Sequence, residues 1–123
     1  MAPQFVSSGH NDVITGTAYA DTAIYHLLNA ASNTGGNGSD VWSNFSLQQG
    51  DKIDIHELLV GWNGQTSTLG NYLSVTTSGN DTVISIDRDG ASGQTYQSTT
   101  LITLENVHTT LDELIEQHHI ITH

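Results

Sequence analysis

The alternation of apolar and polar residues along the second half of the chain predicts a β-hairpin and further strands. Apolar or β-branched residues take every second position over 73–77, turn-forming residues follow at 78–81, and apolar residues resume over 83–86. Further strands are predicted at 99–104, after a glycine loop, and over 53–60, where a strand runs into a short helical turn. The polar residues are mostly Thr, Ser, Asn and Gly, which favour turns and strands, so we expect a mainly β fold.

The tail changes to a helical pattern between positions 110 and 117. Thr110 is suited to cap a helix, two acidic residues follow in the first turn, and apolar residues recur at Leu111, Leu114 and Ile115. This pattern predicts a short amphipathic helix. An apolar end follows at Ile120 and Ile121, and we expect the helix and this tail to cover one open end of the β core.

A nine-residue glycine-rich pattern is the most specific motif in the chain. Residues 35–43 fit Gly-Gly-x-Gly-x-Asp-x-apolar-x at every position. Glycines such as Gly36 and Gly38 allow left-handed backbone angles that turn carbonyl oxygens inward, and Asp40 adds a charged oxygen ligand. Hard oxygen ligands on a tight turn suit Ca²⁺. The apolar residue that follows is expected to start a short, buried strand.

Two weaker copies of this pattern lie upstream and in phase. Residues 7–15 keep Gly9, Asn11 and Asp12, and residues 16–24 keep Gly16 and Asp21. Any flexible loop can have such a composition, but three copies in phase favour calcium. Ions in such an array lie between turns about 18 residues apart. Asp12 would then pair with a turn upstream, while the separation of Asp21 from Asp40 is close to this spacing but displaced by an insertion at 25–34. We therefore expect the end of a longer repeat array with one or two sites.

Charge and composition narrow the classes of function. Thirteen acidic residues face only Lys52 and Arg88, which gives a formal charge of −11. This charge repels nucleic acids and anionic membranes and favours cations, so bound divalent ions would stabilise the fold. The absence of cysteine excludes disulfides and thiolate metal sites. No apolar run approaches the roughly 20 residues of a membrane span, and we expect a single monomeric domain over residues 1–123 without membrane insertion.

Three further groups of side chains are candidates for chemistry. Asp87 and Asp89 precede Gly90 as in other calcium loops, although a turn between two strands explains them equally well. Asp54, like Asp51, is expected either to supply an oxygen ligand or to cap a turn. His118, His119 and His123 could hold a transition metal, but we interpret them as solvated residues of the tail.

Two alternative functions come from different classes. A carbohydrate- or surface-binding module would need an exposed aromatic platform, for which Trp62 is the best candidate, whereas Trp42 is expected to be buried in its repeat. A small hydrolase would need a pocket with paired carboxylates of shifted pKa. No nucleophile elbow or phosphate loop is present, so we expect no enzymatic activity.

Several motifs taken in order resemble a known family. The repeats, the segment 40–45, the segment 50–59 and the segment 83–90 resemble the C-terminal target domain of RTX proteins that are exported by type I secretion. The resemblance spans about residues 7–123, and large bacterial surface adhesins commonly end in such a domain. Residues 51–55 also resemble the matching stretch in the C-terminal domains of serralysin-type proteases. At position 23 the chain has Ala where the repeat has a bulky apolar residue.

The resemblance implies a fold and a function. It implies a short parallel β-roll over the degenerate calcium repeats at 7–43 and a sandwich-like cap over 44–123 that carries an uncleaved export signal. The partners would be an ABC transporter, its adaptor and an outer-membrane channel. The protein would be secreted or displayed on the bacterial surface, where calcium would fold the repeats.

Overall fold

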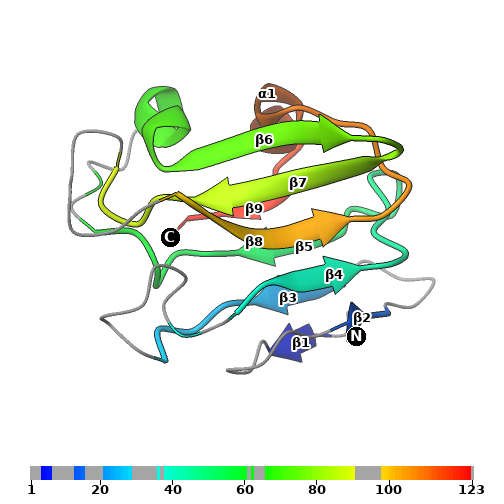
Figure 1. Cartoon of the computed structure of the whole chain (residues 1–123), viewed down its shortest axis with the longest axis horizontal. Helices are drawn as coiled ribbons and strands as arrows, with labels where there is room; N and C mark the ends of the chain where they lie inside the picture. Colours follow the sequence, from blue (N-terminus) through cyan, green and yellow to red (C-terminus); the bar gives the residue numbers. More distant parts are fainter. Residues whose placement is uncertain are drawn as a thin grey trace.

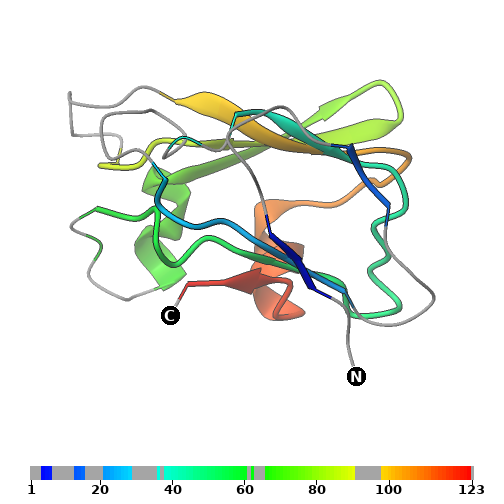
Figure 2. The ribbon, with the colours of Figure 1, turned by 90° about the horizontal axis from the view of Figure 1, so that it is seen from below.

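The chain folds into two β-sheets that face each other across one core (Figures 1 and 2). The computed structural model describes residues 4–6, 13–15, 21–28, 36, 38–60, 62, 66–90 and 98–122. Within these residues the first sheet has the strand order β1-β3-β5-β9 and the second has the order β2-β4-β8-β7-β6. Figure 2 shows the sheets as two layers, which confirms the predicted, mainly β fold.

The first five strands form a parallel β-roll because consecutive strands alternate between the two sheets. Strands β1 (Gln4–Val6), β3 (Thr22–Ile24) and β5 (Lys52–Asp54) lie in the first sheet, and β2 (Val13–Ile14) and β4 (Asp40–Trp42) lie in the second. All pairs among them are parallel. Gln4 pairs with Thr22, so the first coil has the length of two copies of the repeat, as the pattern predicts.

The middle of the chain adds an antiparallel meander to the second sheet. Strands β6 (Leu73–Ser78) and β7 (Asp81–Ile86) form the predicted hairpin, and β8 (Thr99–Leu104) pairs antiparallel with β7 and parallel with β4. Gly79 has a φ of 61° in the hairpin turn, a conformation that glycine adopts without steric cost. A 3₁₀ helix, η1 (Thr66–Asn71), precedes β6.

The C-terminal segment closes the end of the roll that lies opposite β1 and β2 (Figure 1). Helix α1 (Leu111–Glu116) begins at Thr110, whose hydroxyl accepts a hydrogen bond from the Glu113 amide at 3.2 Å, as the capping pattern predicted. Strand β9 (Ile120–Ile121) then pairs parallel with β5. The predicted helix face packs inward: Leu114 is fully buried, and three other apolar residues pack against the core, namely Leu111, Ile115 and Ile120.

The core lies between the two sheets and explains the alternation of buried positions. Trp42 and Ala23 are both fully buried, one from each sheet. The Trp42 ring meets the Phe45 ring edge-on with centroids 5.0 Å apart, and its indole N–H donates to Asn44 Oδ1. Trp42 is therefore the buried residue of its repeat, as predicted. Ala23 keeps the inward position of its repeat although its side chain is small.

Candidate metal sites

The best copy of the repeat has the backbone conformation that its glycines suggest. Gly36 has a φ of 88° and Gly38 a φ of 71°, both in the left-handed region that glycine favours. Asp40 follows at the start of β4 and is fully buried. Neighbouring Gly35 and Asn37 lie outside the described residues. This turn thus supplies the strand start and the glycine geometry of a calcium loop.

The weaker copies fall mostly outside the described residues, but the register of their strands is defined. Gly9, Asn11, Asp12 and Gly16 are not described. Val13 and Val41 are paired, and each directly follows the Asp of its copy in the sequence. The copies that contain Asp12 and Asp40 therefore belong to successive coils of the roll. Asp12 itself lies outside the described residues, so the expectation that it pairs with a turn upstream stays a prediction.

Asp21 has a different partner from the one that its spacing suggested. It precedes β3 in the first sheet, whereas Asp40 begins β4 in the second sheet. Thr22 pairs with Lys52, so the residue one coil away from Asp21 is Asp51. The Asp21 amide donates to Asp51 Oδ1 at 2.8 Å. Successive coils are thus joined at this position by a carboxylate.

Asp51 is a buried residue that holds a turn. Its Oδ2 accepts a hydrogen bond from the Ser46 amide at 2.8 Å, and its side chain is fully buried. Burial raises the pKa of the Asp51 carboxyl above its ordinary value, while the two backbone hydrogen bonds act in the opposite direction. Of the two roles open to Asp51, capping the turn is the one that these contacts support.

His119 is not a solvated tail residue, contrary to the expectation. It is 2% exposed, its Nδ1 donates to the Asp51 carbonyl at 2.6 Å, and its ring meets the Phe45 ring at 5.7 Å. His118 is exposed and adopts a φ of 60° after the helix, and His123 lies outside the described residues. The pairing of β9 with β5 places His119 in the core. No local sequence pattern in the tail predicts this pairing.

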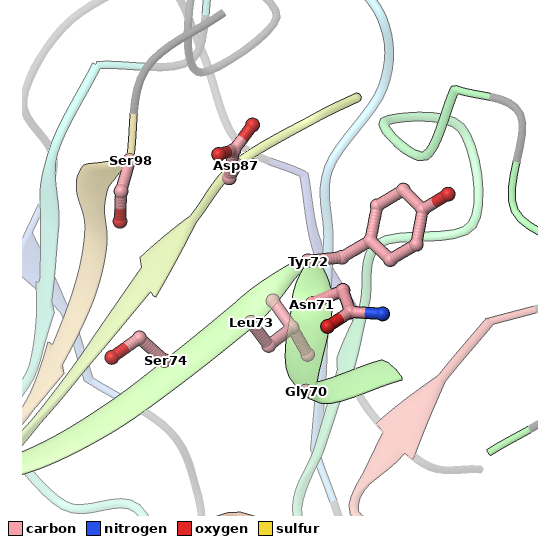
Figure 3. Close-up of a pocket in the computed structure, with 7 residues that line it drawn as sticks. All are labelled: Gly70, Asn71, Tyr72, Leu73, Ser74, Asp87 and Ser98. Carbon is pink, nitrogen blue, oxygen red and sulfur yellow. The ribbon is translucent and has the colours of Figure 1, made fainter. Parts of the chain in front are cut away.

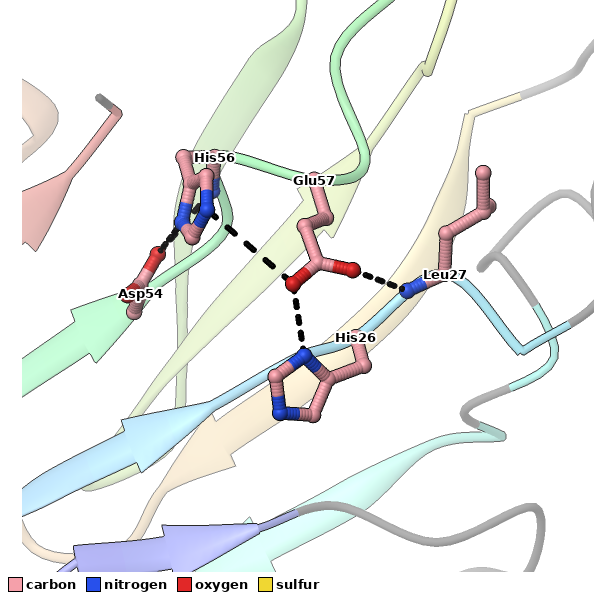
Figure 4. Close-up of polar contacts among 5 residues, drawn as sticks. All are labelled: His26, Leu27, Asp54, His56 and Glu57. Carbon is pink, nitrogen blue, oxygen red and sulfur yellow. Dashed lines mark hydrogen bonds and ion pairs between the residues drawn. The ribbon is translucent and has the colours of Figure 1, made fainter.

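Asp54 takes part in a polar network at the ends of β3 and β5 (Figure 4). His56 Nδ1 lies 2.5 Å from Asp54 Oδ1, and His26 Nδ1 lies 2.6 Å from Glu57 Oε2. The hydrogen bond to Asp54 is the main cause that raises the pKa of His56, and the hydrogen bond from His26 is the main cause that lowers the pKa of Glu57. His26 and Glu57 lie far apart in the sequence, so the pair joins two coils of the roll.

Asp87 and Asp89 lie on a tight turn at the end of β7. The Gly90 amide donates to the Asp87 carbonyl at 3.1 Å, which confirms a turn. Burial, followed by the hydrogen bond and charge of Asp89, raises the pKa of Asp87. Asp87 Oδ1 is buried and has no hydrogen-bond partner among the described residues. A cation between these carboxylates would relieve their repulsion and satisfy this oxygen, so the turn fits a hard divalent ion.

A pocket of about 180 Å³ borders the same turn (Figure 3). Its lining comes from η1, β6 and the ends of β7 and β8: Gly70, Asn71, Tyr72, Leu73, Ser74, Asp87 and Ser98. Asp87 and Asp89 are hydrogen-bonded to each other. They are thus closer than the roughly 5 Å or more that separates the carboxylates of glycoside hydrolases, so this pair does not match that mechanism.

Trp62 does not form an exposed aromatic platform. It is partly buried against the core, and its indole N–H donates to Thr68 Oγ1 at 3.1 Å. Tyr72 is also partly buried and lies close to Gly90. Tyr96 lies outside the described residues. The observation that would have favoured a carbohydrate-binding role is therefore not found at Trp62.

Comparisons with known proteins do not establish a function for these candidate sites. No protein-family model and no curated protein matches the chain. A similar solved structure is the solution structure of the AlgE6R3 subunit from the Azotobacter vinelandii mannuronan C5-epimerase. It is 22% identical, with a TM-score of 0.42 and coverage of 98% of this chain and 68% of that chain. A likeness this loose establishes no shared function. None of the helices in the described part of the chain is long and apolar enough to cross a membrane.

Proposed function

We propose that the chain is a calcium-binding module without catalytic activity that ends the repeat array of an exported RTX-type protein. The observation that carries this proposal is the register of β2 and β4, in which Val13 pairs with Val41. This register places two copies of the calcium pattern in successive coils, and Gly36 and Gly38 have the positive φ angles of such loops. Two copies of the repeat therefore match the length of the first coil, from Gln4 to Thr22, and the insertion at 25–34 lengthens the next one.

Calcium is the ion that the available ligands would prefer. The pattern offers backbone carbonyls from glycine turns and the carboxylate of Asp40. Asp87 and Asp89 offer two further carboxylates at a separate turn. When bound, the ion would neutralise part of the formal charge of −11 that opposes a compact chain. Within the described residues, no group of three or more His, Cys, Asp or Glu side chains is arranged to hold a metal, so carbonyl oxygens would supply the other ligands.

The C-terminal segment would act as the uncleaved export signal. A type I ABC transporter, with its adaptor and outer-membrane channel, would recognise this segment, and the module would be a monomer that is secreted or retained on the cell surface as part of an adhesin. Leu114 is buried and Ile121 is paired with Asp54 in the folded chain. Recognition of these apolar residues would therefore require the unfolded chain. Calcium outside the cell would then fold it.

Thermal melts test the calcium proposal. We compare the chain with Asp40→Asn and with Glu116→Gln, an exposed position that removes the same charge. Circular dichroism is recorded in EDTA, in millimolar calcium and in millimolar magnesium. A ligand at one hundred times its Kd adds about 2.7 kcal/mol to the free energy of unfolding. We expect a calcium-specific rise of the melting temperature that Asp40→Asn reduces and Glu116→Gln keeps. Equal melts in all three buffers would contradict the proposal.

Secretion of a fusion protein tests the export proposal. A passenger fused ahead of the whole chain is expected to leave bacteria only when a matching type I transporter is present. The triple change of Leu111, Leu114 and Ile115 to Ser is expected to prevent release, because it removes the apolar face of α1. Its matched control replaces Glu116 with Gln on the exposed face of the same helix. Retention of the unmodified fusion despite the transporter would reject this role.

A further inference from the structure

Strand β6 is the longest of the strands that lie at the edges of the two sheets. Within the described residues these edge strands are β1 and β9 in the first sheet and β2 and β6 in the second. Strands β1, β2 and β9 have two or three residues each, whereas β6 has six. A short edge offers an incoming strand little to pair with, so β6 is the edge that is long enough to hold another strand.

The register of the hairpin shows which backbone groups of β6 face outward. The Asp87 amide donates to the Tyr72 carbonyl at 2.7 Å, and this pair continues the ladder between β6 and β7 in register. Hydrogen-bonded pairs alternate with non-hydrogen-bonded pairs along an antiparallel ladder. Every second residue of β6 therefore pairs with β7 through its backbone. The N–H and C=O groups of the residues in between, Leu73, Val75 and Thr77, point away from β7.

These outward backbone groups form an unprotected edge. In the described part of the chain, no hydrogen bond joins them to another element. Natural edge strands are usually protected by a charged side chain, a proline, a bulge or a covering segment. Strand β6 pairs with β7 without a register shift, and it contains neither a charged residue nor a proline. Four of its six side chains are exposed, namely Ser74, Thr76, Thr77 and Ser78, so the strand is not covered.

The surface beside β6 is acidic. Helix α1 lies next to β6 (Figure 1), and its acidic side chains, Asp112, Glu113 and Glu116, are exposed. Lys52 and Arg88 are the only Lys and Arg residues of the chain, and among the described residues neither forms an ion pair with these acids. A segment with basic side chains would meet opposite charge here. A second copy of the chain would instead bring another formal charge of −11.

We infer that β6 is a docking edge for an extended, basic segment of another protein. The segment would add a strand to the second sheet and would form backbone hydrogen bonds with Leu73, Val75 and Thr77. Its Lys or Arg side chains would lie near the acidic side chains of α1. Backbone hydrogen bonds would supply most of the affinity, and charge would select the partner. This inference does not depend on the proposed calcium and export functions.

Binding of a labelled peptide to the whole chain tests the inference. The probe is a ten-residue peptide that alternates Val and Lys, and fluorescence anisotropy in millimolar calcium measures its affinity. Val75→Pro removes the central outward N–H, and proline is tolerated on an edge strand where this group faces solvent. Its matched control, Val75→Thr, keeps the N–H and a β-branched side chain. We expect Val75→Pro to weaken binding about tenfold or more and Val75→Thr to keep it within about twofold.

Two further peptides separate strand pairing from charge. A peptide with Glu in place of each Lys is expected to bind at least about tenfold more weakly than the basic probe. A peptide that keeps every Lys but has Pro in place of each Val cannot pair as a strand, so it is expected not to bind. Hydrogen exchange is expected to slow at the amides of Leu73, Val75 and Thr77 when the basic probe binds.

The outcomes separate a docking edge from the alternatives. Circular dichroism melts identify a Val75→Pro variant that fails to fold, and the peptide series with hydrogen exchange then decides the question. Equal affinity for the proline-containing peptide would overturn the inference, because charge alone would explain the binding. Protection confined to amides outside β6, or no binding at peptide concentrations up to a millimolar, would overturn it as well. Self-association that Val75→Pro abolishes would assign the edge to a second copy instead of a basic partner.

Discussion

The roll and the meander differ in how their strands are held. In the roll, strands β1 to β5 have only two or three residues each, and each strand pairs with the coil before or after it. In the meander, β6, β7 and β8 have six residues each and pair antiparallel along their length. Backbone hydrogen bonds along six-residue strands therefore stabilise the meander. The stability of the roll depends more on side-chain contacts between the turns of successive coils.

The contacts at the turns of the roll are of three kinds. The Asp51 carboxylate joins two coils on one side, and the pair of His26 and Glu57 joins two coils on the other side. The turn of Gly36 and Gly38 adds a candidate calcium loop. Because these contacts involve charged side chains, the stability of the roll is expected to depend on pH, and the candidate calcium loop is expected to make it depend on calcium as well.

Trp42→Ala is expected to have the largest effect, because it acts where the two regions meet. Trp42 is fully buried in β4, which pairs with β2 of the roll and with β8 of the meander. Loss of a buried Trp side chain costs about 3–5 kcal/mol of unfolding free energy. Urea unfolding followed by circular dichroism and by the fluorescence of Trp62 would measure it. Two separate transitions would show that the regions unfold independently, contrary to the shared core.

Asp51→Ala is expected to loosen the roll by about 2 kcal/mol. The change leaves the Asp21 and Ser46 amides without their acceptor in a buried place, at a cost of about 1–3 kcal/mol for each unsatisfied group. Relief of the buried charge offsets part of this cost. Urea unfolding in EDTA would measure it, and Asp51→Asn, which retains one acceptor, is expected to cost less. A loss below about 0.5 kcal/mol would show that the carboxylate does not join the coils.

Asp87→Asn is expected to act with opposite signs in two buffers. The pKa of Asp87 is raised mainly by burial and then by Asp89, so the contribution of this group to stability is present below its ordinary pKa and is lost as the pH rises through the raised value. In EDTA at about pH 7 the variant is expected to melt above the unmodified chain. In calcium the melting temperature of the variant is expected to rise less than that of the unmodified chain. A lower melting temperature in EDTA would contradict the repulsion between the two carboxylates.

His118→Gly is expected to have the smallest effect, a gain of about 0.5–1 kcal/mol. His118 follows α1 with a φ of 60°, and its amide donates to the Ile115 carbonyl while the next amide donates to that of Leu114. This is the helix ending in which glycine is usual. Replacement of the exposed side chain relieves backbone strain, as measured by chemical unfolding. His118→Ala keeps the strain and is not expected to raise stability.

Local patterns predicted the meander and the helix because both are defined by neighbouring residues. The turn at 78–81 and the alternation around it specify β6 and β7, and the Thr110 hydroxyl specifies the start of α1. The repeat also predicted the glycine conformations at Gly36 and Gly38. In each case the information lies within a few residues of the feature.

Register across the roll could not be predicted in the same way. The pairing of Asp21 with Asp51 rather than Asp40 depends on how long the connections between strands are and on which sheet each strand enters. His119 is buried because β9 pairs with β5, a strand from the first half of the chain. The contact between His26 and Glu57 also joins distant parts of the sequence and follows from the same stacking of coils. The residues near each of these positions do not show which distant strand or coil they will contact.

The pairing of β9 with β5 has a consequence for the order of folding. Closing the long loop between Ile53 and Ile120 costs about 3 kcal/mol more chain entropy than closing the turn between Ser78 and Asp81. The hairpin can therefore form early, while the first sheet gains its last strand only after nearly all of the segment 53–121 has become available. Loss of β9 would leave β5 with an open edge, so the strand that joins the first sheet last is also the one that covers this edge.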